Sequence, residues 1–162
     1  MILLFIIFLC PIFTDSLKYI DPILSNTPIK IDSKLKGSLI PKLPKELSPS
    51  EMKIQKLKSK DFIPKPITEY DIVKMETNLG EMKFIFYVKD APNHAYNFKK
   101  LANSGFYDET YFHRIIKDFM VQGGDVNTRD NDYTNDGLGN PGWLIDEEFN
   151  KIQHKKGILS MA

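Results

Sequence analysis

The sequence predicts a mainly β domain of the α+β or barrel type in its C-terminal part. Alternating apolar and polar residues on both sides of residues 78–80 indicate two paired strands. A helix pattern covers residues 92–105, and shorter strand-like runs follow it. Because strands and helices do not alternate along this part of the chain, we do not expect the βαβ units of a parallel sheet.

The sequence indicates where the first hairpin turns and where the helix begins and ends. Residues 78–80, Asn-Leu-Gly, have the chemistry of a turn. The helix is expected to begin near Pro92, where a first-turn proline is harmless, and to end at Gly105, which suits a C-terminal cap. The return strand of the hairpin places on one face, as a core surface, the side chains of Met82, Phe84, Phe86 and Val88.

Three more short strands are expected after the helix. Two of them cover residues 111–116 and 119–122, and the last covers residues 157–161. Residues 126–142 are rich in Asn, Asp and Gly, as a long exposed loop would be.

The chain opens with an apolar segment, from Met1 to Phe13. It falls short of the roughly 20 residues needed to cross a bilayer, so residues 1–14 are interpreted as a signal peptide or a short apolar leader. This predicts export to the periplasm or the secretory pathway, or a membrane tether through residues 1–13. No Lys or Arg precedes the segment and no small-x-small cleavage site follows it. The alternatives are a buried strand or a wrongly assigned start codon.

Residues 15–69 are predicted to be a Pro/Lys-rich linker that is mostly irregular. Their prolines recur too often for long helices or central strands, and Lys outnumbers the acidic residues. One short helix, from Ser50 to Lys60, is compatible with this pattern, with Ser48 or Ser50 as its cap and Pro49 in the first turn. The domain proper is expected to cover residues 70–162.

Composition excludes several classes of function. The formal charge is +1 and the lysines form no stripe among aromatic residues, so we expect no nucleic-acid partner. The only cysteine is Cys10, and the histidines have no ligand spacing, so no metal site is expected. Ser160 is not in a nucleophile elbow, and Glu147 and Glu148 are interpreted as solvated charges.

The segment from Phe112 to Asp125 is the strongest candidate for chemistry. It places Arg114 and Gln122 among aromatic and aliphatic residues, and an arginine in so apolar a strand needs a partner. Spacing alone leaves a structural interpretation open, in which Arg114 covers the rim of a core and Gln122 satisfies backbone groups.

The same segment, Phe-His-Arg-Ile-Ile-Lys-Asp-Phe-Met-Val-Gln-Gly-Gly-Asp, resembles the signature of the cyclophilin family of peptidyl-prolyl cis-trans isomerases. Residues 77–81, 90–92, 97–98, 105–107 and 157–162 resemble other segments of that family in the right order. The resemblance implies an eight-stranded antiparallel barrel closed by a helix at each end. It also implies isomerisation of X-Pro bonds without a cofactor or metal, with proline-containing polypeptides as substrates.

The resemblance assigns roles to individual residues. Arg114 would be the catalytic arginine, and Gln122 would hydrogen-bond the substrate backbone. Phe119 and Met120 would line the proline pocket, and Ala162 would lie at its edge. A tight two-residue turn at residues 117–118 would put Arg114 and Gln122 on opposite faces, so the assignment predicts a wider loop or a bulge there.

By the same resemblance, the chain holds about five of the family's eight strands and one of its two helices. We therefore expect an incomplete cyclophilin-like domain, which would be a monomeric peptidylprolyl isomerase when complete. The alternative is a non-catalytic Pro-peptide binding module, or an inactive fragment, because the second half of the pocket is missing.

Overall fold

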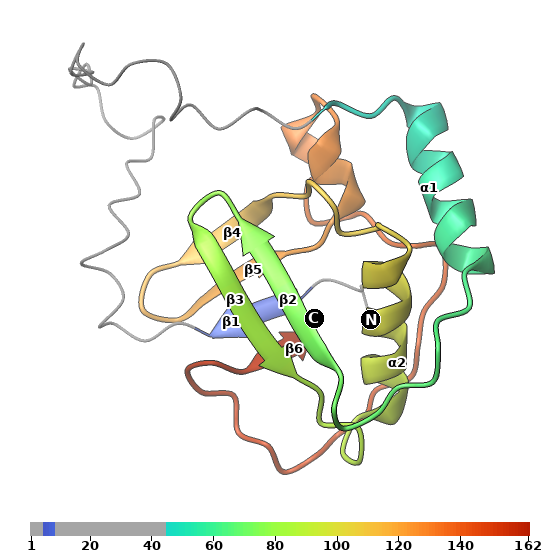
Figure 1. The fold of residues 1–162 in the computed structure, drawn as a ribbon. Helices are drawn as coiled ribbons and strands as arrows, with labels where there is room; N and C mark the ends of the chain where they lie inside the picture. Colours follow the sequence, from blue (N-terminus) through green and yellow to red (C-terminus); the bar gives the residue numbers. More distant parts are fainter. Residues whose placement is uncertain (1–4, 9–44) are drawn as a thin grey trace.

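A computed structural model describes residues 5–8 and 45–162, and the statements below concern those residues. Figure 1 shows them as one β-rich body with two longer helices. The elements are β1 (Phe5–Phe8), α1 (Pro49–Asp61), β2 (Ile72–Thr77), β3 (Gly80–Ile85), α2 (Pro92–Asn103), β4 (Phe112–Ile116), β5 (Met120–Gly123), η2 (Val126–Arg129), η3 (Tyr133–Asn135) and β6 (Leu159–Met161). Most of the predicted leader and residues 15–44 of the predicted linker lie outside the described residues.

The strands form two antiparallel sheets. One is the predicted hairpin of β2 and β3, joined by a two-residue turn because Thr77 pairs with Gly80. The other has the order β4-β5-β1-β6, in which β1 pairs with β5 on one edge and with β6 on the other. Strand β1 comes from the apolar leader, so the described part of that segment has the strand conformation that was the alternative interpretation (Figure 1).

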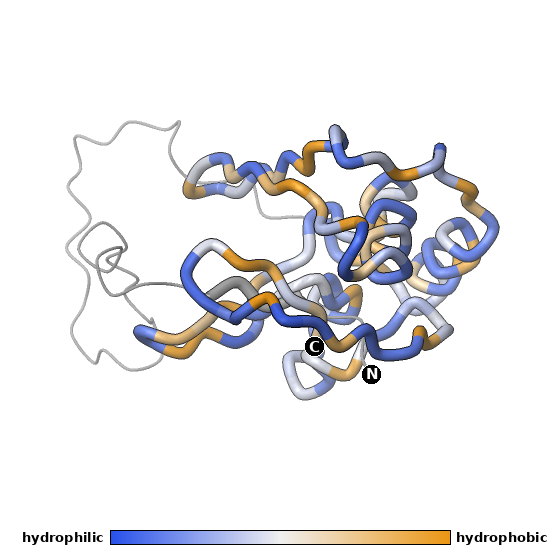
Figure 2. The backbone as a smooth tube through the Cα atoms, turned by 90° about the horizontal axis from the view of Figure 1, so that it is seen from below, coloured by the Kyte–Doolittle hydropathy of each residue, from blue (hydrophilic) through white to orange (hydrophobic). Residues whose placement is uncertain are grey.

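Helix α2 begins and ends close to the predicted positions, and its buried side chains belong to both hydrophobic clusters of the domain. Pro92 stands in its first turn, and Gly105 follows its end with φ 78°. Phe98 packs against the inner face of the β2–β3 hairpin, and Leu101 forms a second cluster with Phe106 and Val126. Hydrophobic and hydrophilic residues alternate along much of the backbone (Figure 2), as expected for strands with one buried face.

The N-terminal cap of α2 corrects the interpretation of Glu148 as a solvated charge. Ala91 at the N-cap offers no side-chain hydrogen bond. Instead the Glu148 carboxylate accepts hydrogen bonds from the backbone N–H groups of Asn93 (3.0 Å) and His94 (2.9 Å). Burial raises the pKa of Glu148, but these hydrogen bonds outweigh it, so the pKa lies below its usual value.

The described part of the predicted linker contains a helix that packs on the domain. Helix α1 begins after the N-cap Ser48 with Pro49 in its first turn, as predicted, and Glu51 completes a capping box. The buried hydroxyls of Ser104 and Ser59 are 2.7 Å apart in a hydrogen bond. The boundaries assigned to leader, linker and domain stay predictions.

No helix among residues 45–162 is both long and apolar enough to span a bilayer.

Candidate active site

The β4–β5 hairpin carries four of the five predicted site residues, and its register brings two of them together. Ile116 pairs with Met120, so the connecting loop has three residues, 117–119. Asp118 in this loop has φ 60°, and the Phe119 N–H donates to the Ile116 carbonyl (3.1 Å). The wider loop predicted from the sequence is confirmed, and a register shift between Phe112 and Arg114 adds a bulge.

Arg114 and Gln122 are therefore directly opposite each other on adjacent strands and share a face of the sheet. The Arg114 Nη1 group donates a hydrogen bond to Gln122 Oε1 at 3.3 Å. Gln122 is 8% exposed and Arg114 is exposed. A guanidinium has five N–H donors, and within residues 45–162 Arg114 uses one of them on another side chain, which leaves donors for a ligand.

The other predicted site residues differ in how much surface they present. Phe119, in the connecting loop, is 52% exposed, whereas Met120 at the start of β5 is only 1% exposed. Ala162 follows β6, and β1 lies between β6 and β5. Two strand spacings, about 10 Å, therefore separate its strand from the hairpin. The structure joins Arg114 to Gln122 but does not join Ala162 to them.

Asp125 was interpreted from the sequence only as part of a break, yet it anchors the loop beside the site. Its buried carboxylate accepts hydrogen bonds from the backbone N–H groups of Asn127 (2.8 Å), Gly137 (2.6 Å) and Gly139 (3.1 Å). Part of the segment predicted to be an exposed loop is thereby buried. Spacing could not reveal this, because hydrogen bonds to residues twelve and fourteen positions away depend on the fold.

His113, next to Arg114, faces this anchored loop. A Cβ atom built on Gly137 would lie 3.5 Å from His113 Nε2. Burial lowers the pKa of His113, and the nearby carboxylates of Asp125 and Asp136 offset this effect only in part. A neutral imidazole is therefore favoured, as expected for a structural histidine.

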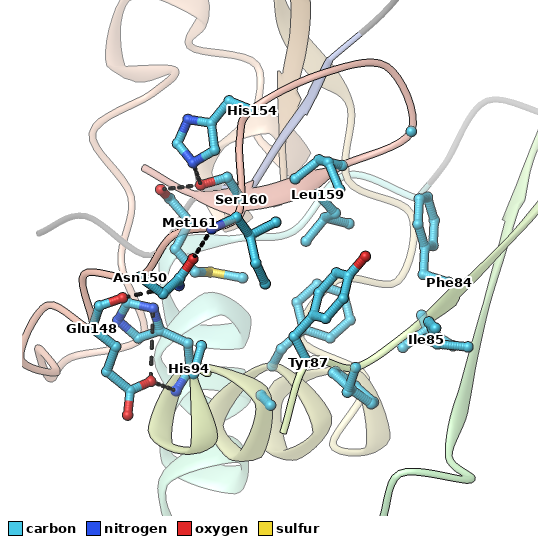
Figure 3. A pocket seen from close by; sticks show the side chains of 18 of the residues that line it. Phe84, Ile85, Tyr87, His94, Glu148, Asn150, His154, Leu159, Ser160 and Met161 are labelled. Atoms are coloured by element: carbon cyan, nitrogen blue, oxygen red, sulfur yellow. Dashed lines mark hydrogen bonds and ion pairs between the residues drawn. The ribbon is translucent and has the colours of Figure 1, made fainter. Parts of the chain in front are cut away.

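A cavity of about 710 Å³ lies elsewhere, between β3, α2 and residues 147–161 (Figure 3). Phe84, Phe98 and Leu159 are among its apolar lining residues. On its rim Ser160 Oγ and His154 Nε2 are 3.2 Å apart, and the two side chains point toward each other in Figure 3. Arg114 does not line this cavity, so it is separate from the candidate site.

No group of three or more His, Cys, Asp or Glu side chains in the described part of the chain has a metal-binding arrangement. His94, for example, pairs with the Asp146 carbonyl (3.0 Å).

Comparison of the sequence with known protein families agrees with the cyclophilin-like motif on the β4–β5 hairpin. The family model for cyclophilin type peptidyl-prolyl cis-trans isomerase/CLD matches residues 72–162. This chain belongs to the cyclophilin family. The resemblance noted from the sequence is thus confirmed, and the small strands and helices described above are consistent with part of a cyclophilin domain.

Several curated cyclophilins are similar to this chain. A peptidyl-prolyl cis-trans isomerase of Synechococcus elongatus is 43% identical over 88 residues, which cover 54% of this chain and 56% of the relative. Peptidyl-prolyl cis-trans isomerase-like 1 of Neurospora crassa is 41% identical over 97 residues, which cover 56% of this chain and 54% of the relative. The chain spans about half the length of these relatives. No solved structure matches it significantly.

Proposed function

We propose that this chain carries the catalytic hairpin of a peptidyl-prolyl cis-trans isomerase that acts on X-Pro bonds in proline-containing polypeptides. The observation that carries the proposal is the Arg114–Gln122 pair, held on one face by a three-residue loop. The names of the similar proteins support the same activity.

The chemistry suits these residue types. The barrier to rotation of an X-Pro bond is amide resonance, and weakening it requires neither a nucleophile nor a proton acceptor. An N–H of Arg114 directed at the prolyl nitrogen would stabilise its lone pair as the bond twists, an interaction absent from the planar ground state. Gln122 would orient the guanidinium through its Oε1 and would leave its amide N–H groups for the substrate backbone.

The energy required exceeds what one hydrogen bond supplies. Shortening an uncatalysed time of tens to hundreds of seconds to milliseconds corresponds to about 10⁵ in rate, or roughly 7 kcal/mol. A charge-assisted hydrogen bond contributes about 1.5–3 kcal/mol, so an apolar wall and backbone anchoring must supply the remainder. Phe119, exposed in the loop, is suited to such a wall. Met120 would have to gain exposure to take part.

Further features of the proposal rest on the sequence. The complete domain would be a closed eight-stranded barrel and a monomer, with Ala162 at the pocket edge. The apolar segment 1–13 supports a role in folding exported proteins of the periplasm or secretory pathway, or a tether to the membrane. The second candidate, a non-catalytic Pro-peptide binding module, is favoured by the nearly complete burial of Met120.

Replacing Arg114 with Ala in the full chain tests the proposal. Isomerisation of a short X-Pro peptide, followed by exchange NMR, is expected to slow on the order of 10²–10³-fold, as when one oxyanion-hole donor is removed. Peptide affinity, measured by calorimetry, should change little. Lys151→Ala, which removes an exposed cation outside the hairpin, is the matched control.

Two outcomes would count against catalysis. An unchanged rate in the Arg114 variant would remove Arg114 from the mechanism. Peptide binding by the unmodified chain without any isomerisation would favour the binding module.

A further inference from the structure

Strand β4 carries one residue more than β5 immediately before the candidate catalytic arginine. Phe112 pairs with Gly123. Two positions further along β4, Arg114 pairs with Gln122, which is only one position away on β5. His113 is therefore the extra residue of a β-bulge. Because a bulge bends its strand and changes the direction in which nearby side chains point, the aim of Arg114 depends on how this bulge is held.

On one side the bulge is held by direct contact between the Phe112 ring and the backbone of Gly123. A Cβ atom built on Gly123 would lie 2.8 Å from Phe112 Cδ1 and 3.2 Å from the Tyr111 carbonyl oxygen. The first of these separations is too short for a real contact, so a side chain at this position would force the ring or β4 to move. The φ angle of Gly123 is not positive, so other residues could adopt its backbone conformation. What the glycine supplies is space for the ring.

Both residues that precede Arg114 are fixed by parts of the fold outside the hairpin. The Phe112 ring packs against Phe98 of helix α2, which is buried. The His113 ring lies against Gly137, whose backbone N–H donates a hydrogen bond to the buried Asp125 carboxylate (2.6 Å). The bulge therefore lies between the helix on one side and the anchored loop on the other.

The link between Arg114 and Gln122 is sensitive to this arrangement. Their hydrogen bond, at 3.3 Å, is longer than the usual distance of about 2.7–3.2 Å for N–H···O. A shift of a few tenths of an ångström in β4 would therefore break it. Because Arg114 directly follows the bulge, any displacement of the Phe112 ring from Gly123 reaches the guanidinium through the backbone.

We propose that Gly123 is a positioning residue for Arg114. By leaving room for the Phe112 ring on β5, it fixes the bulge in β4 and so holds the guanidinium beside Gln122. This inference deepens the proposed isomerase function and rests on it, since a misplacement of about 1 Å at a reacting group can cost on the order of a hundredfold in rate.

Gly123→Ala in the full chain tests the proposal. The kcat for isomerisation of a short X-Pro peptide, followed by exchange NMR, is expected to fall on the order of tenfold to a hundredfold, with KM nearly unchanged. Adding Phe112→Ala removes the ring that the new methyl group meets, so the double variant should be severalfold more active than Gly123→Ala. Val121→Ala is the matched control, because it removes volume from the same Phe98 cluster, two positions away on β5. It should lower stability without lowering kcat.

A second measurement does not depend on catalysis. The nuclear Overhauser effect between the side chains of Arg114 and Gln122 should weaken in Gly123→Ala and persist in Val121→Ala. If the unmodified chain shows this effect but no isomerisation, the proposed function fails, and the comparison of the two variants still decides whether Gly123 positions Arg114.

The inference is overturned if Gly123→Ala keeps both the rate and the Overhauser effect. It is also overturned if Val121→Ala lowers kcat as much at an equal loss of stability, or if Phe112→Ala restores no activity to Gly123→Ala, since general destabilisation would then explain the loss. Should Gly123→Ala not fold, Phe112→Ala alone takes its place, because it removes the ring from an intact Gly123. An unchanged Overhauser effect in that variant would equally contradict the inference.

Discussion

The two long helices satisfy the free N–H groups of their first turns in opposite ways. Helix α1 uses residues within its own first turn, Ser48 and Glu51, which bond each other's backbone. Helix α2 has no such residue and depends on Glu148, which lies more than fifty positions away in the sequence. A local cap stabilises its helix alone, whereas a distant cap ties the helix to another part of the fold. Damage at the second kind of cap should therefore spread further.

The largest effect is expected at Gly139, whose N–H donates a hydrogen bond to the Asp125 carboxylate. This position tests whether a carboxylate that is distant in the sequence anchors the loop. A Cβ atom there would lie only 1.7 Å from Asp125 Oδ1, so Gly139→Ala must displace the buried carboxylate. The expected cost is about 3 kcal/mol of unfolding free energy, measured by urea denaturation. Gly139 does not have a positive φ, so backbone strain at this position adds nothing to the cost of the added Cβ. A loss within about 0.5 kcal/mol, as for an ordinary surface substitution, would mean that the Asp125 anchor contributes little.

The next largest effect is expected at the distant cap. Glu148→Gln replaces a charged acceptor of two backbone hydrogen bonds with a neutral one, which should cost about 2 kcal/mol at neutral pH. Because folding lowers the pKa of Glu148, its contribution is complete above the unfolded value of 4.5 and is lost as pH falls through the lower folded value. Urea denaturation at several pH values should show the two proteins converging in acid. A difference that does not depend on pH would exclude this mechanism.

The smallest effect is expected at the local cap. Ser48→Ala removes the side-chain acceptor for the Glu51 N–H and should cost about 1 kcal/mol or less. Hydrogen exchange should show the loss confined to the first turn of α1, with the β4–β5 hairpin unchanged. If protection also fell in the hairpin, the contrast between local and distant caps would be wrong.

These contrasts also explain what the sequence could predict. The cap of α1, the Asn-Leu-Gly turn and the limits of α2 depend on neighbouring residues, and each was predicted closely. A loop wider than two residues, or a bulge, was predicted from the requirement that Arg114 and Gln122 share a face, and the structure has a three-residue loop. The return strand was expected to reach Val88, but β3 ends at Ile85. Its partner strand β2 begins at Ile72, directly opposite Ile85, so no partner continues the pairing.

Other features depend on contacts that spacing does not encode. The Glu148 cap, the Asp125 anchor and the buried Ser59–Ser104 hydrogen bond all join residues far apart in the sequence. Polar residues of these kinds are usually exposed, so composition suggested solvated charges, a loop and a linker. The roles of Arg114, Phe119, Met120, Gln122 and Ala162 in catalysis stay predictions.

Strand β1 has a consequence for the order of events during synthesis. Phe5 pairs with Gly123 and with Met161, so its partners are made more than a hundred residues later. At roughly 5–20 residues per second, the leader waits on the order of ten seconds before a pairing strand exists. The order β4-β5-β1-β6 therefore forms only late in synthesis, after residue 161 has been added to the chain.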